Sequence, residues 1–232
     1  MKVAIMQPYF FPYIGYFQLI HSVDLFILYD NIKYTKKGWI NRNRLLRDHS
    51  DFQISLPLTK QSDFCEIRDR SIAPSFNRIK FLNQIKEAYR KAPYFKPAYS
   101  MVSDIIENDE QNLFKFLHSS ICKVSDELNL DTKILISSEI DIDHNLKGQD
   151  KIFSICKAVQ ATEYVNAIGG QELYSKEDFS RMGIDLSFVL SKPISYAQFS
   201  NTFIPWLSII DVLMFNACCH IKDDILLKYE LI

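Results

Sequence analysis

The side chains best suited to chemistry are concentrated in two segments near the start of the chain. Residues 7–16 read Gln-Pro-Tyr-Phe-Phe-Pro-Tyr-Ile-Gly-Tyr and combine tyrosine hydroxyls with a glycine. Residues 31–47 hold six lysines and arginines, one tryptophan and no acidic residue. Arginine and lysine bind phosphate groups, and a tryptophan ring offers a stacking surface for a base or a sugar. Together the two segments indicate a site for a nucleotide or another ligand that carries phosphate.

The first segment follows a short apolar run at residues 3–6 and leads into helical spacing from Ile14 onwards. A glycine at this place lets a nucleotide approach the backbone closely, and the free amides of a helix start bind phosphate oxygens. We therefore expect this segment to bind ATP as cofactor. The residues assigned to it are Gln7, Tyr9, Phe10, Tyr13, Gly15 and Tyr16. The alternative is a buried aromatic cluster that only packs the loop.

The order of strand, loop, glycine and helix resembles the adenylyl-handling loop of the nucleotidyltransferase-like superfamily, which includes pantothenate synthetase. In that superfamily a His-x-Gly-His motif opens the first helix. Here Tyr13-Ile14-Gly15-Tyr16 stands in that place, so both histidines are tyrosines. A tyrosine hydroxyl can donate a hydrogen bond to an oxyanion, but it carries no positive charge near neutral pH. The resemblance therefore implies a position for the nucleotide, whereas the cationic histidines of that superfamily are missing.

The second segment follows an apolar run that ends in an acid, and its basic residues have no counter-charge nearby in the sequence. An extended segment places Trp39, Asn41 and Asn43 on one face and Arg42 and Arg44 on the other. We expect Lys36 and Arg42 to act in catalysis by offsetting phosphate charge in the transition state. The residues expected to contact the substrate are Asp30, Trp39, Asn41 and Asn43. The alternative is a solvated basic strand.

A third group of polar residues lies at two strand-to-helix passages in the second half of the chain. Lys147 precedes an expected helix at residues 148–159, and anions are favoured at such a helix start. Asn166 follows an expected short strand, and the pair Gly169-Gly170 permits close approach of a ligand. We expect Lys147 to add a catalytic charge, and the asparagine and glycines to bind substrate. The alternative is ordinary turn chemistry.

The apolar pattern predicts alternating strands and helices. Buried strands are expected at 3–6, 25–29, 133–136, 164–165 and 186–190, and a hairpin from 34–47 and 52–56. Helical spacing covers 14–20, 75–89, 97–106, 113–128, 148–159, 173–181, 205–215 and 219–229. The predicted fold class is α/β, a Rossmann-like parallel sheet flanked by helices, similar to the nucleotidyltransferase-like fold. We expect one domain over residues 1–232, with a helical insertion or lid at about 75–128.

This fold class has a consequence for the two segments at the start of the chain. The carboxyl ends of parallel strands meet at one edge of the sheet, and ligands bind at that edge. Residues 7–15 and 30–44 each follow an expected strand, so they should lie together at one site. Asp211, inside the expected helix at 205–215, needs hydrogen-bond partners if it is buried.

The composition argues against several classes of protein. Lysine and arginine total 27 against 28 acidic residues, so no overall charge favours nucleic acid or a membrane surface. The five cysteines show no CxxC spacing, which favours reduced thiols in the cytoplasm. No signal-peptide pattern and no apolar run of about 20 residues is found, so we expect a cytoplasmic protein. Neighbouring Cys218, Cys219 and His220 would point apart on a helix, so we expect no metal site made by the protein.

Six stretches of the sequence resemble the WbqC-like protein family, over nearly the whole chain. They are AIMQPYFFPYIGYFQLI at 4–20, GWINRNR at 38–44, KAPYF at 91–95, LKGQ at 146–149, YVNAIGG at 164–170 and PWLSIIDVLMFN at 205–216. The resemblance implies a place in the biosynthesis of O-antigen, the polysaccharide of lipopolysaccharide, or of another surface polysaccharide. It also implies modification of an amino sugar with an amino acid or an acyl group such as glycine.

The residues and the resemblance lead to one hypothesis with two alternatives. We expect a ligase that joins a small carboxylic or amino acid to a nucleotide-linked amino sugar by an amide bond, through an acyl adenylate. This reaction would use ATP with Mg²⁺, whose ligands the phosphates would supply. One alternative is an ATP-independent acyl or aminoacyl transferase. The other is a protein that binds nucleotide sugars without catalysis.

Overall fold

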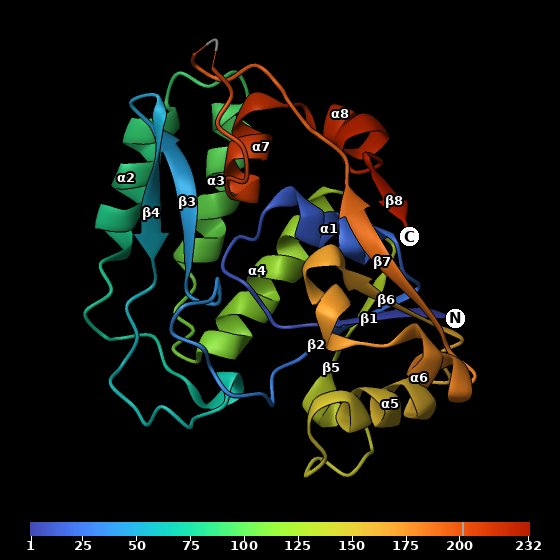
Figure 1. Ribbon diagram of the computed structural model, residues 1–232. Coiled ribbons are helices and arrows are strands. Elements are labelled where there is room, and N and C mark those ends of the chain that lie inside the picture. Colours follow the sequence, from blue (N-terminus) through green and yellow to red (C-terminus); the bar gives the residue numbers. More distant parts are fainter. Residues whose placement is uncertain (201) are drawn as a thin grey trace.

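The centre of the computed structural model, which describes residues 1–200 and 202–232, is a six-stranded sheet (Figure 1). In spatial order the strands are β5 (Lys133–Ile136), β2 (Leu25–Leu28), β1 (Lys2–Met6), β6 (Glu163–Ala167), β7 (Asp185–Ser191) and β8 (Tyr229–Leu231). The first five are parallel, and β8 pairs antiparallel with β7 at one edge. The predicted Rossmann-like α/β fold is therefore confirmed.

Helices cover both faces of this sheet. They are α1 (Ile14–His21), α4 (Leu113–Glu127), α5 (Gly148–Ala158) and α6 (Lys176–Arg181). α1 and α4 share a core with Ala4 and Phe26, whereas α5 and α6 share another with Val3 and Ile5 (Figure 1). Successive strand residues face opposite sides, so a strand buried on both sides must be apolar throughout, as Leu25–Leu28 is. Within the described part of the chain, no helix is both long and apolar enough to cross a membrane.

A lobe of one hairpin and three helices lies beside the sheet, at the left and top of Figure 1. Its elements are β3 (Arg42–Arg47), β4 (Ser50–Ser55), α2 (Arg78–Tyr89), α3 (Phe95–Ile106) and α7 (Ile209–Phe215). Asp48 and His49 have φ of 50° and 61°, as two-residue hairpin turns require. The predicted hairpin is confirmed, but its first strand begins at Arg42 because residues 35–41 form turns and bends. Of the helices within the predicted insertion at 75–128, α2 and α3 belong to this lobe and α4 packs on the sheet.

The end of the chain differs from the sequence prediction. The expected helix at 205–215 begins only at Ile209, because Trp206 has φ of 61°, in the left-handed region that a helix excludes. The expected helix at 219–229 is replaced by α8 (Cys218–His220), a π-helical turn (Ile221–Ile225) and β8. Pairing of β8 with the edge of the sheet outweighs the local helical spacing.

Asp211 is buried in the lobe and has three hydrogen-bond partners. Its carboxylate accepts from the hydroxyls of Tyr89 (2.8 Å) and Tyr196 (2.6 Å) and from the side-chain amide of Gln198 (2.8 Å). The Tyr89 oxygen accepts from the N–H of Leu46 (2.8 Å), so the network joins α7, α2 and β3. Burial raises the pKa of the Asp211 carboxyl above its ordinary value of 3.8, although the three hydrogen bonds act in the opposite direction.

This raised pKa predicts a pH dependence of folding stability. The folded protein holds the Asp211 proton more tightly than the unfolded chain, so this group stabilises the fold fully below its ordinary pKa. The contribution is lost as pH rises through the folded pKa, by up to about 1.4 kcal/mol per pH unit. We expect the stability of the wild type relative to Asp211→Asn to fall as pH rises above about 4. Urea unfolding at a series of pH values measures this relative stability, with the exposed Asp109→Asn as control. A stability difference between the wild type and Asp211→Asn that did not change with pH would contradict the prediction.

Candidate functional site

The strand order defines where a ligand is expected. The order in which the strands are added to the sheet reverses at β1. β2 and β5 follow on one side of β1, whereas β6, which pairs with β1, begins the other side. In open α/β sheets ligands bind outside the carboxyl ends of the strands at such a switch point. Gln7 follows β1 directly, and Asn166 lies near the end of β6. The same edge holds Asp30, two residues beyond the end of β2.

The loop after β1 and the basic segment before β3 are joined by buried hydrogen bonds. The side-chain amide of Asn43 donates to the carbonyls of Phe10 (3.0 Å) and Phe11 (2.7 Å), and the N–H of Phe10 donates to the carbonyl of Trp39 (3.1 Å). The Asn43 oxygen accepts from the N–H of Arg44 (2.8 Å), so every polar group of this buried amide is used. The structure therefore brings the two predicted segments together, and Asn43 acts as the link between them.

A small cavity of about 120 Å³ lies where the segments meet, and we call it the aromatic cavity. Its lining consists of Tyr9, Pro12, Tyr13, Trp39, Asn43, Arg44 and Trp206. The rings of Trp39 and Trp206 are 41% and 62% exposed, so both can meet a ligand. The guanidinium carbons of Arg42 and Arg44 lie 5.9 and 5.6 Å from the centre of the Trp39 ring. An aromatic and cationic surface of this kind suits a sugar or base with a neighbouring negative charge.

The predicted alternation over residues 39–44 is wrong, because the chain before β3 is not extended. Trp39 lies on the side of Arg42 and Arg44 and not opposite to them. Arg42 donates to the carbonyls of Gly38 (2.9 Å) and Lys37, so it fastens the turn. Arg44 lines the cavity instead, and its guanidinium bonds Asp51 (3.2 Å) and the Trp206 carbonyl (3.2 Å).

The start of α1 is covered by an aromatic ring. A Cβ added to Gly15 would lie 2.3 Å from a ring carbon of Tyr13 and 2.6 Å from the Tyr13 hydroxyl oxygen. The glycine therefore makes room for Tyr13, whose ring packs edge-on against Trp206 at 5.8 Å between centroids. As it stands, this helix start does not fit the phosphates of a nucleotide, because the ring occupies the place of their approach.

The other residues assigned to ATP lie in different surroundings. The Tyr16 side chain is buried, its hydroxyl donates to the carbonyl of Gln7 (3.0 Å), and burial raises its pKa. Phe10 is fully buried, with its ring 4.9 Å from that of Phe11. Of the six residues only Tyr9 and Tyr13 line the aromatic cavity, and burial raises the pKa of each. Both tyrosines are therefore neutral hydrogen-bonding groups near pH 7.

The predicted substrate and charge residues are spread over several places. Asn41 accepts from the Tyr34 hydroxyl (2.8 Å) and donates to the Leu56 carbonyl (2.8 Å), so it anchors the base of the hairpin. Lys36 forms an exposed ion pair with Asp63 at 2.7 Å. Lys147 precedes α5 as predicted and is exposed.

The end of β6 presents an amide and an open glycine. The Asn166 side-chain oxygen accepts from the N–H of Ala167 (2.8 Å). A Cβ on Gly170 would lie 2.7 Å from the Asn166 side-chain nitrogen, so this glycine is needed for the asparagine to pack. A Cβ on Gly169 would meet nothing within 4 Å, so the backbone there is open to a ligand.

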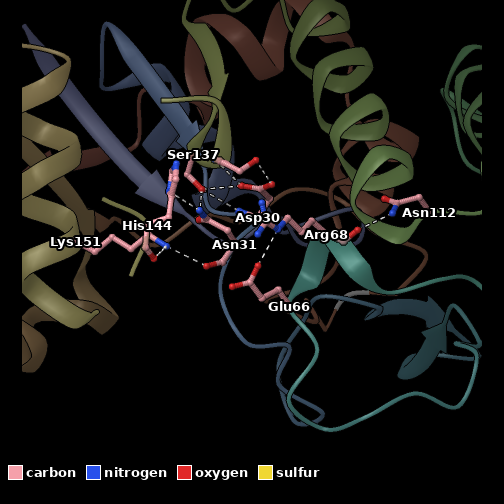
Figure 2. A network of polar contacts seen from close by, with 9 residues as sticks. Asp30, Asn31, Glu66, Arg68, Asn112, Ser137, His144 and Lys151 are labelled. Atoms are coloured by element: carbon pink, nitrogen blue, oxygen red, sulfur yellow. Dashed lines mark hydrogen bonds and ion pairs between the residues drawn. The ribbon is translucent and has the colours of Figure 1, made fainter. Parts of the chain in front are cut away.

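A second polar group lies at the ends of β2 and β5 (Figure 2). The Asp30 carboxylate accepts from the Ser138 hydroxyl (2.6 Å) and N–H (3.0 Å), and the Ser137 hydroxyl oxygen lies 2.8 Å from it. That hydroxyl is also 2.8 Å from the Asn31 side-chain oxygen, and the Asn31 amide nitrogen lies 2.9 Å from Nδ1 of His144. Asp30 is thus buried and satisfied, in a role that holds two strand ends together.

Sequence reasoning missed Ser137, Ser138 and His144 of this group, and also Lys151 of α5. Lys151 is buried, and among the described residues its ammonium donates only to the carbonyls of Asn31 (3.2 Å) and His144 (3.5 Å) (Figure 2). The ammonium lies 5.3 Å from the centre of the Tyr29 ring. Burial lowers its pKa, although nearby carboxylates act in the opposite direction. The sequence did contain a signal of its burial, because Lys151 lies four residues before Ile155 and therefore on the apolar face of the helix.

Comparison with known proteins identifies the family. The sequence matches the WbqC-like protein family over residues 7–223. The chain belongs to this family. A relative that is 27% identical over 225 residues, 96% of either chain, is "Uncharacterized protein Rv1507c" of Mycobacterium tuberculosis (strain ATCC 25618 / H37Rv). No solved structure matches the chain.

The WbqC-like stretches at 4–20 and 38–44 are the two segments that meet at the aromatic cavity. A third WbqC-like stretch, 205–216, supplies Trp206 to its wall and Asp211 to the buried network. In the described residues, 201 excepted, no group of three or more His, Cys, Asp or Glu side chains could hold a metal ion. The residues that carry the family resemblance are therefore also those that shape the cavity.

The cover on α1 predicts a coupling between two substitutions. Gly15→Ala forces the Tyr13 ring away and should destabilise the fold by about 1–3 kcal/mol, the cost of overpacking. In a Tyr13→Ala background the same change meets no ring, so it should stabilise by about 0.5–1 kcal/mol through helix propensity. Urea unfolding of the four variants measures both effects. An equal effect of Gly15→Ala in the two backgrounds would show that the ring does not cover the helix start.

Proposed function

We propose that this WbqC-like protein is an enzyme of surface-polysaccharide biosynthesis that forms an amide on the amine of a nucleotide-linked amino sugar. The observation that carries the proposal is the aromatic cavity, which residues of three family motifs line beyond the carboxyl end of β1. Rings of this kind pack against the apolar face of a sugar, and a neighbouring arginine suits a phosphate or a polar substituent.

The proposed substrate is positioned by groups already held in place. Asn43 fixes the loop that carries Tyr9 and Tyr13, and Arg44 is held by Asp51 and the Trp206 carbonyl. Such fixed donors cost little to organise when a ligand binds. The acyl partner is a small carboxylic or amino acid. In this proposal the amino group of the sugar lies at the open side of the cavity, between Trp39 and Trp206.

One route to the amide uses ATP with Mg²⁺ and an acyl adenylate. The phosphates would supply the ligands of the magnesium ion. This route requires Tyr13 to turn away from Gly15, because the helix start does not fit phosphates in the present arrangement.

The second route is acyl or aminoacyl transfer from a preactivated donor, without ATP. The covered glycine and the use of the Tyr16 hydroxyl on the Gln7 carbonyl favour it. The residues that line the aromatic cavity include no carboxylate and no histidine, which favours a third possibility, binding without catalysis.

One assay separates these functions. The purified protein is incubated with a nucleotide-linked amino sugar and glycine or another small acid, with ATP, without ATP, or with the acid in a preactivated form. The products are analysed by mass spectrometry. An amide product together with AMP supports the adenylate route. An amide formed only from a preactivated donor supports transfer. Saturable binding of the sugar nucleotide without any amide would support the binding protein and overturn the enzyme.

The aromatic cavity predicts that Trp39→Ala weakens substrate binding without loss of stability. The ring is partly exposed, so its removal leaves the core intact, whereas a stacked ring contributes about 1–3 kcal/mol, or roughly ten- to a hundredfold in affinity. Calorimetric titration with the sugar nucleotide measures the affinity, and urea unfolding measures the stability. Tyr94→Ala is the control, because Tyr94 is similarly exposed and lies outside the cavity. Equal affinity of the Trp39 variant and the wild type would remove the cavity from the site.

A further inference from the structure

A basic hollow lies on the other side of the loop that carries Trp39. It consists of two adjoining spaces of about 470 and 380 Å³ that share Tyr34, Lys36, Asp63 and Arg70. Segments 30–34 and 65–68 form its frame, through bonds such as that from the Tyr34 N–H to the Cys65 carbonyl (3.1 Å). The basic lining residues are Lys33, Lys36, Lys37, Lys60 and Arg70, against the single acid Asp63.

Arg70 is a buried cation without a counter-charge. Only 4% of it is exposed, and its guanidinium carbon lies 4.6 Å from the centre of the Tyr34 ring. One terminal nitrogen donates to the Ser62 carbonyl (2.7 Å), whereas the buried Nε has no partner. Across residues 1–200 and 202–232, no carboxylate lies within ion-pair distance of it. A buried charge that is neither paired nor fully hydrogen-bonded is costly, so an anion at this place would stabilise it.

The hollow has a positive potential. Lys36 lowers the pKa of the Asp63 carboxyl by hydrogen bond and charge, and Arg70 and Lys33 add to the effect. Asp63 and Lys36 are about two-thirds exposed, so their ion pair is weak and its members are free to separate. A ligand phosphate could therefore replace the Asp63 carboxylate beside Lys36.

The hollow and the aromatic cavity are neighbours across one turn. Arg42 links them, since it bonds the Gly38 carbonyl, lies 5.9 Å from the Trp39 ring and exerts its charge on Tyr34. A ligand that placed a sugar on Trp39 would thus have a route past Arg42 to Arg70.

We infer that the basic hollow binds the diphosphate of the nucleotide-linked substrate, with Arg70 and Lys36 as its ligands and with Asp63 displaced. The inference rests on the proposed function for the identity of the ligand. The second terminal nitrogen of Arg70, which has no protein partner among the described residues, can donate to a phosphate oxygen, and Lys36 adds a point charge from the rim. The function of the buried arginine is then to fix the phosphates, so that the sugar extends toward the aromatic cavity.

The first test is binding of inorganic pyrophosphate and of UDP to the full chain, by calorimetric titration at low salt. Lys36→Ala should weaken the binding of both by about two- to fivefold, the range of an exposed charge pair. Lys123→Ala is the matched control, because Lys123 forms a similar exposed ion pair with Asp104 (2.8 Å) and neither residue lines the hollow, so this variant should change nothing.

The second test uses the acid. Asp63→Asn removes the carboxylate that occupies Lys36 and should tighten the binding of pyrophosphate by about two- to fivefold. Asp104→Asn, the acid of the control pair, should leave it unchanged. A misfolded variant would lose affinity for pyrophosphate. A gain of affinity in Asp63→Asn therefore cannot result from misfolding.

The third test is Arg70→Lys, which keeps the charge and removes the fork. Binding of pyrophosphate should weaken by about tenfold, as expected for loss of a charge-assisted hydrogen bond, with the fold checked by circular dichroism. The inference would be overturned if the wild type bound neither pyrophosphate nor UDP. It would also be overturned if the Lys36 and Asp63 variants bound pyrophosphate with the affinity of the wild type. Failure of the amide assay with these binding effects intact would overturn the proposed function alone.

Discussion

The candidate site of this protein depends on one buried amide. Asn43 donates to two successive carbonyls, those of Phe10 and Phe11, and accepts from the N–H of Arg44. Phe11 has φ of 42°, which turns the loop so that both carbonyls face the hairpin. Left-handed backbone at a bulky residue costs about 1–3 kcal/mol, and a neighbouring group must hold it in place. The Ser208 hydroxyl, which donates to the Phe11 carbonyl (2.7 Å), gives the same turn a second partner. The aromatic cavity exists because these bonds hold three distant segments at one point.

Buried charged groups are treated in two ways in this fold. Asp30 and Asp211 are surrounded by donors, and each serves to join elements that are far apart in the sequence. Arg70 and Lys151 have backbone carbonyl acceptors but no ion pair in the described parts of the chain. A satisfied carboxylate contributes to the architecture, whereas a cation without a counter-charge is a place where an anion is favoured. The hollow around Arg70 is such a place.

The tyrosines at the start of α1 change the chemistry that the helix can perform. Tyr13 covers Gly15, and Tyr16 is committed to the Gln7 carbonyl. Burial raises the pKa of both hydroxyls, so neither supplies a charge near neutral pH. An anion bound at this edge would need other cations for its stabilisation, such as Arg44 of the hairpin or the lysines of the basic hollow.

The sequence by itself determined the five parallel strands of the sheet, the flanking helices and the hairpin. A short apolar run such as Leu25–Leu28 is typical of a strand buried on both faces, and strand ends imply that residues 7–15 and 30–44 are neighbours. Only the tertiary structure decided which side chains reach the cavity. A turn at 35–41 moved Trp39 to the side of the arginines, an edge pairing turned a predicted helix into β8, and packing buried Phe10 and Tyr16. The local sequence could not show that Arg70 and Lys151 lack an ion-pair partner, because the groups around them come from distant parts of the chain.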